Sequence, residues 1–108
     1  MANFDDFLAG LKNEVSAFAE GQLKNVKDRA VADGGAFVQA LKADLQNWTN
    51  QLAAGKLSQD DFKFLVAGKK DLAELTALKE AGLAQAQLDQ FVNGLVAVVV
   101  KTAVKAFA

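Results

Sequence analysis

Apolar residues recur at intervals of three and four along almost the whole chain, and this spacing matches the 3.6-residue turn of an α-helix. The composition supports the same structure, because alanine and leucine, the strongest helix formers, account for 21 and 14 of the 108 residues. The sequence also contains no proline, the residue that most disrupts a helix. The sequence therefore predicts an all-α fold.

Glycine-containing segments interrupt this pattern at three places and predict a small up-down bundle of four helices. The clearest interruption is at residues 33–35, the second at 54–58 and the weakest at 81–83. A first helix is expected from about residue 3, with Asn3 as its cap, to about residue 32, and a second from about 35 to 54. A 30-residue helix is about 45 Å long, so the bundle is expected to be somewhat elongated. The length of the chain fits one domain over residues 1–108.

The third helix begins with the strongest local signal, because Ser58 precedes Asp61 by three residues as in a capping box. Phe62 and Phe64 lie on different faces of this helix, which predicts either neighbours on both sides or a kink at Gly68. Gly82 either ends this helix or lies within one long or kinked helix that continues to residue 107. The four-helix arrangement is favoured, because 50 helical residues would extend about 75 Å and overhang the second helix.

The last segment, residues 83–107, has an apolar surface that is too wide for an ordinary amphipathic helix. Its apolar side chains cover roughly 240° of the helical wheel, and Lys101 and Lys105 lie on the remaining side. Three explanations are open: a central core helix, an assembly surface, or a helix on a membrane surface. The most apolar stretch, residues 91–107, is shorter than the roughly 20 residues that span a bilayer.

A second candidate surface lies on the first helix, where two glycines and an alanine share one flank. Glycine inside a helix costs up to about 1 kcal/mol relative to alanine, so such a flank predicts either close approach of another helix backbone or tolerated surface glycines. The approaching helix would be the last helix or a second subunit. Both surfaces together give the candidate interface, which comprises Gly10, Ala17, Gly21, Val92, Val96, Val99, Val100, Ala103 and Phe107.

The residue types exclude most catalytic chemistry. The chain has no cysteine and no histidine, and therefore no thiol nucleophile, no imidazole base and no usual zinc site. The two aspartate pairs, at 5–6 and 60–61, fall in the first turns of expected helices, where they complement the helix dipole. A net charge of −1 and a single arginine, Arg29, argue against nucleic acid as a partner. No catalytic, cofactor-binding or metal-binding residue is predicted, and the protein is not expected to be an enzyme.

These observations predict a non-catalytic helical-bundle protein that acts through protein–protein interaction or self-assembly, as a homo-oligomer or with another protein. The alternative is a protein that binds apolar ligands, lipid or a membrane surface through its last helix. It would use a cavity or groove lined by Phe91, Leu95, Val98 and Val99 against Phe18 and Trp48. The N-terminal residues show no charged-then-apolar leader, so a cytoplasmic location is expected.

Overall fold

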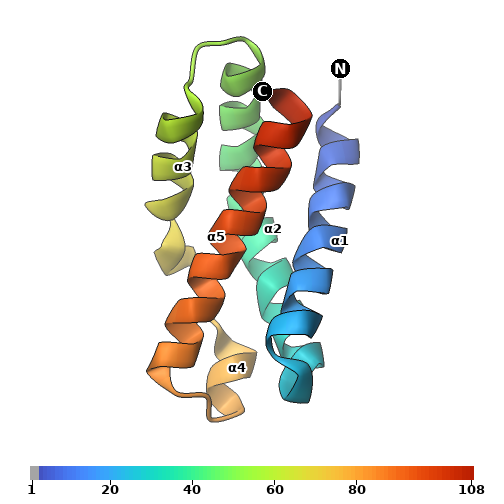
Figure 1. Cartoon of the computed structure of the whole chain (residues 1–108), viewed down its shortest axis with the longest axis vertical. Helices are drawn as coiled ribbons and strands as arrows, with labels where there is room; N and C mark the ends of the chain where they lie inside the picture. Colours follow the sequence, from blue (N-terminus) through green and yellow to red (C-terminus); the bar gives the residue numbers. More distant parts are fainter. Residues whose placement is uncertain (1–2) are drawn as a thin grey trace.

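The structure is a computed structural model that describes residues 3–108, and this part of the chain contains helices and no strands. Four longer helices run alternately up and down the bundle, and a short fifth helix lies at one end (Figure 1). The molecule measures 43 × 23 × 19 Å. The expectation of an elongated all-α bundle is therefore confirmed, with these elements: α1 (Phe4–Gln22), α2 (Lys27–Ala53), α3 (Gln59–Ala67), α4 (Thr76–Glu80) and α5 (Gln85–Phe107).

One cluster of apolar side chains holds these helices together. The largest fully buried members are Phe37 of α2, Phe62 of α3 and Phe91 of α5. All three come from different helices, so the core forms only when the helices are packed against one another. Fully burying a side chain of this size contributes roughly 1.5–3 kcal/mol, which outweighs the mediocre helix propensity of the valines in α5.

The predicted break at residues 33–35 is wrong, and so are the helix boundaries that depended on it. α1 ends at Gln22, a 3₁₀ turn occupies Lys24–Val26, and α2 then runs through both glycines. Gly34 is buried, and a Cβ atom there would lie 2.7 Å from the Val15 side chain. This glycine therefore allows α2 to approach α1 closely and does not end a helix. The chain turns instead at Leu23, where φ is −129° and ψ is 66°.

The remaining helix ends follow the predicted signals. Asn3 Oδ1 accepts a hydrogen bond from the Asp6 amide at 2.8 Å, and Ser58 Oγ accepts one from the Asp61 amide at 3.0 Å. Gly55 and Gly82 have φ angles of 73° and 83°, the left-handed conformation that glycine adopts without strain. The third and fourth predicted helices are therefore separate and not continuous across Gly82.

The segment from residue 58 to 81 is more divided than a kinked helix. α3 ends at Ala67, a 3₁₀ turn η2 follows at Lys70–Leu72, and α4 occupies five residues. Leu75, which precedes α4, has a φ of 55° and is buried. A non-glycine residue adopts this conformation at a cost of roughly 1–2 kcal/mol, so its burial in the core must compensate.

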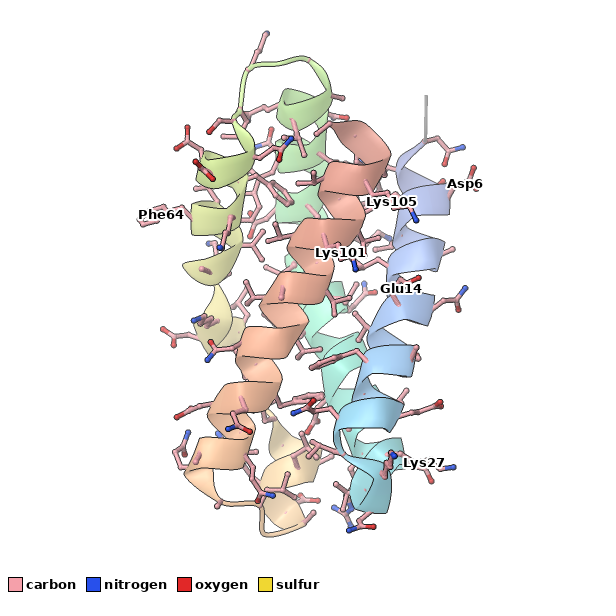
Figure 2. The ribbon with its side chains drawn as sticks, in the orientation of Figure 1. Asp6, Glu14, Lys27, Phe64, Lys101 and Lys105 are labelled. Carbon is pink, nitrogen blue, oxygen red and sulfur yellow. The ribbon has the colours of Figure 1, made fainter. Side chains whose placement is uncertain are left out.

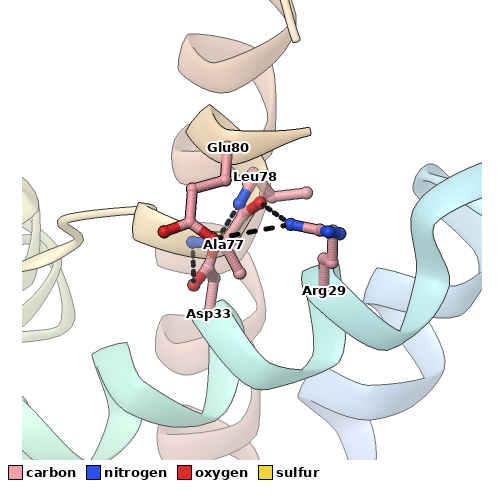
Figure 3. Close-up of polar contacts among 5 residues, drawn as sticks. All are labelled: Arg29, Asp33, Ala77, Leu78 and Glu80. Atoms are coloured by element: carbon pink, nitrogen blue, oxygen red, sulfur yellow. Dashed lines mark hydrogen bonds and ion pairs between the residues drawn. The ribbon is translucent and has the colours of Figure 1, made fainter. Parts of the chain in front are cut away.

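Polar contacts fix α4 to α2 (Figure 3). The residue before α4, Leu75, has no side chain that can cap the helix, and a side chain of α2 takes this role. The carboxylate of Asp33 accepts hydrogen bonds from the amides of Ala77, at 3.2 Å, and Leu78, at 2.8 Å. Arg29 Nη1 donates to the Ala77 carbonyl at 3.0 Å and lies 3.7 Å from Glu80 Oε2. The only arginine of the chain therefore has a structural role in this contact.

Candidate functional site

α5 is covered by its own chain on only part of its apolar surface. In Figure 1, α5 lies in front of α2, with α3 on one side of it and α1 on the other. Val92, Val98, Val100 and Val104 all remain half-buried. Its fully covered residues follow one face and are Leu88, Phe91, Leu95, Val96, Val99 and Ala103. The uncovered valines make α5 the leading candidate for a functional surface, because apolar area left open on a small bundle commonly marks an interface.

The flank of α5 that faces α1 is tightly packed around Gly94. The Phe18 ring of α1 occupies the space that a side chain at Gly94 would need. Phe18 also stacks on Phe91, with ring centroids 5.6 Å apart and planes inclined by 20°. Nearer the C-terminus, Phe7 meets Phe107 edge to face at 5.1 Å. Aromatic side chains therefore fill this flank at Gly94 and again near the C-terminus.

The flank of α5 that faces α3 is open. A groove of about 500 Å³ runs between the two helices, with an apolar floor and lysines on both edges. Lys63 and Lys70 come from the α3 side and Lys101 from α5, and no carboxylate lines the groove within residues 3–108. We call this the basic groove. Its lining comprises Gln59, Lys63, Ala67, Lys70, Asn93, Val96, Ala97, Val100, Lys101 and Val104.

A second, larger hollow of about 1090 Å³ continues along α5 toward its N-terminal end, and we call it the acidic groove. It shares Lys70 and Asn93 with the basic groove, so the two form one cleft along the helix. Its four carboxylates, against two lysines, give it the opposite charge. These carboxylates belong to Asp71, Glu74, Glu80 and Asp89.

A third groove, between α1 and α5, has balanced charges. Asp6 and Glu14 of α1 lie opposite Lys101 and Lys105 of α5 across a hollow of about 480 Å³ (Figure 2). Gly10 forms part of this hollow. Because its carboxylates and ammonium groups face one another within the chain, this groove presents a weaker net field to a partner than the basic groove does.

The structure separates the predicted interface residues into three groups. Val96, Val99 and Ala103 are buried within the chain, so core packing already accounts for them. Val92, Val100 and Phe107 are half-buried, and only Val100 lines the basic groove. The flank of α1 is open: Ala17 and Gly21 are exposed, and a Cβ at Gly10 or Gly21 would meet no atom within 4 Å. Neither glycine is therefore in close contact with another helix of this chain, and contact of this flank with a second subunit stays a prediction.

Sequence reasoning missed the lysines of the α3 side. Lys63 and Ala67 are spaced by four residues and share one face of α3, and Lys70 follows in the 3₁₀ turn η2. That spacing was the available signal, but it becomes meaningful only when α3 is known to end at Ala67 beside α5. Within this chain the closely packed glycines are Gly34 and Gly94, whereas Gly10 and Gly21 have room for a Cβ atom.

The residues predicted to line a ligand cavity or groove differ in burial. Phe91, Leu95 and Val99 are fully buried in the core, whereas Val98 and Phe18 are half-buried. Within the described residues, no three histidine, cysteine or acidic side chains gather as metal ligands. α5 is long and apolar enough to cross a membrane by length and composition alone, with a mean hydropathy of 1.3 over its best window. A core helix of a soluble protein passes the same test, so this property does not decide between the alternatives.

Comparison with known proteins gives no further guide to function. No protein-family model, curated protein or solved structure matches this chain significantly. The function of this bundle must therefore be inferred from its own surface, in which the cleft along α5 is the most distinctive feature.

Proposed function

We propose that this protein is a non-catalytic interaction protein that self-assembles through the cleft along α5. The observation that carries this proposal is the incomplete cover of α5. Val100 and Val104 are only half-buried over a groove with an apolar floor, although Gln59, Lys63 and Ala67 on the α3 side line the same groove. Toward its N-terminus α5 extends beyond α3, because α3 has nine residues and α5 has 23.

The composition of the cleft supports a protein partner. The basic groove has an apolar floor with lysines at its edges, whereas the lining of the acidic groove is mainly polar. An apolar centre with a polar rim is the usual arrangement of a protein–protein interface. The charged rim sets orientation and partner choice, whereas the apolar floor supplies most of the binding free energy.

Sedimentation over a range of concentrations tests this proposal with one matched pair of variants. Ala97 and Ala43 are both exposed and both lie within helices, but only Ala97 lines the cleft. We expect the wild-type chain to associate as its concentration rises, Ala97→Asp to weaken that association, and Ala43→Asp to leave it unchanged. A wild-type chain that stays monomeric up to millimolar concentration would contradict self-assembly.

A second candidate function is the binding of an anionic amphiphile or a membrane surface. Two observations favour it: α5 is strongly apolar, and Lys63 and Lys101 lie at the edges of the basic groove. Flotation with vesicles of anionic lipid tests this candidate. Lipid binding would carry the protein upward with the vesicles at low salt, and its failure to float would exclude this function.

A further inference from the structure

The cleft along α5 has opposite charges at its two ends. The basic groove carries Lys63 and Lys101 on its two walls, and the acidic groove carries Glu74 and Asp89 in the corresponding positions. Asn93 belongs to both grooves and marks the point where the charge changes sign. All four charged side chains are exposed, and Lys101 also lines the hollow between α1 and α5, opposite Glu14.

This polarity restricts how two copies of the chain can meet at the cleft. If the copies lay parallel, with a two-fold axis along α5, basic groove would face basic groove and acidic would face acidic. If they lay antiparallel, with the axis crossing α5 near Asn93, each basic groove would face the acidic groove of the other copy. Only the antiparallel arrangement is favourable electrostatically, and a two-fold axis then satisfies both ends of the cleft at once.

We infer that the occupant of the cleft is a second copy of this chain, placed antiparallel about a two-fold axis near Asn93. This inference rests on the proposed self-assembly and adds its geometry. The net charge of −1 means that two copies repel each other only weakly at long range, so the local charges decide the orientation. An acidic peptide would complement the basic groove alone and leave the carboxylates of the acidic groove without a partner.

Reversing the charges at each end tests the orientation. Lys63→Glu with Lys101→Glu makes the whole cleft acidic, and Glu74→Lys with Asp89→Lys makes it basic. We expect each pair of substitutions to weaken self-association at least about tenfold, because like charges then face each other. The variant with all four substitutions again has opposite ends, and its affinity should return to within about threefold of the wild type.

A control pair distinguishes this local effect from a change in net charge. Lys12→Glu with Lys27→Glu alters the net charge as much as the basic-groove pair does, but both lysines are exposed and outside the cleft. Lys27 lies at the start of α2, far from Lys101 in Figure 2. We expect this control to associate like the wild type, and circular dichroism should show that every variant remains helical.

The failures of the two proposals are distinguishable. A wild-type chain that never associates overturns the self-assembly itself. Association that resists both charge reversals, or that the four-substitution variant fails to regain, overturns the antiparallel arrangement while leaving self-assembly intact. Recovery in the four-substitution variant supports the antiparallel arrangement, because a parallel pair would still place like charges together after the exchange.

Discussion

The two flanks of α5 are built from the same helix but differ in how completely they are covered. Toward α1, a 19-residue helix lies alongside, and the Phe18 ring fills the space above Gly94. Toward α3, a nine-residue helix leaves a groove of about 500 Å³ over Val100. Both flanks also carry a hollow toward the C-terminal end of α5, of about 480 Å³ on the α1 side and about 500 Å³ on the α3 side. The flanks therefore differ in aromatic packing and in charge, since carboxylates line only the hollow on the α1 side.

The largest change in the free energy of unfolding should come from a charge placed in the core at Val99, compared with the same charge placed in the groove at Val100. Val99 is fully buried and Val100 is half-buried, although the two are adjacent. Val99→Asp buries an unpaired carboxylate and should cost more than about 4 kcal/mol, enough to unfold a marginal bundle. Val100→Asp should leave the chain folded, with a loss of about 1 kcal/mol or less. Urea denaturation followed by circular dichroism measures both, and a folded Val99→Asp chain would show that Val99 faces a partner.

The next effect concerns the opposite end of the bundle, where α4 forms one wall of the acidic groove. Asp33→Ala removes the acceptor of two amide hydrogen bonds and should lower the free energy of unfolding by about 2 kcal/mol. Hydrogen exchange at the amides of Ala77 and Leu78 should accelerate more than exchange in α1. Equal acceleration throughout the chain would mean that α4 does not open locally.

A pair of identical substitutions compares close packing with an open surface. Gly94→Ala introduces a Cβ that meets the Phe18 ring, and it should destabilise the fold by about 1–2 kcal/mol after its gain in helix propensity. Gly10→Ala meets no atom within 4 Å and should stabilise the fold by about 0.5–1 kcal/mol. Thermal unfolding measures both changes, and shifts of the same sign would contradict the difference in packing between the two sites.

The smallest effect is expected at Phe64, which is 77% exposed and points away from the bundle on the outer side of α3. Phe64→Ser should change the free energy of unfolding by no more than about 0.5 kcal/mol. Its association should match that of the wild type, since Phe64 does not line the cleft. A loss of association would extend the interface beyond the cleft to the outer face of α3.

Much of the fold could be predicted because its signals are local. The caps at Asn3 and Ser58 and the glycine turns at Gly55 and Gly82 depend on residues within a few positions of one another. The turn at Leu23 was not predicted, because Gly21, the nearest glycine, fits equally well on the flank of a continuous helix. Gly34 carries the opposite signal, and its place inside α2 depends on Val15, a distant residue of another helix.

The candidate site was predicted only in part, because it depends on contacts between helices that are distant from one another in the sequence. The wide apolar arc of α5 correctly indicated a helix with more apolar surface than an ordinary amphipathic helix buries. Which valines remain open depends on where α3 ends and on how η2 and α4 lie beside α5, and the sequence shows neither. The lysine edges of the groove come from two helices, so no single helical wheel brings Lys63 and Lys101 together.

The most direct test of the difference between the two flanks uses thiol labelling, because the chain contains no cysteine of its own. Val98→Cys and Val100→Cys each place one thiol at a half-buried position, and the two lie 200° apart around α5. The labelling rate of Val100→Cys should fall as protein concentration rises, since a second copy covers the groove, while that of Val98→Cys stays constant. Labelling rates that are independent of concentration at both positions would contradict the assignment of the α3-facing flank as the interface.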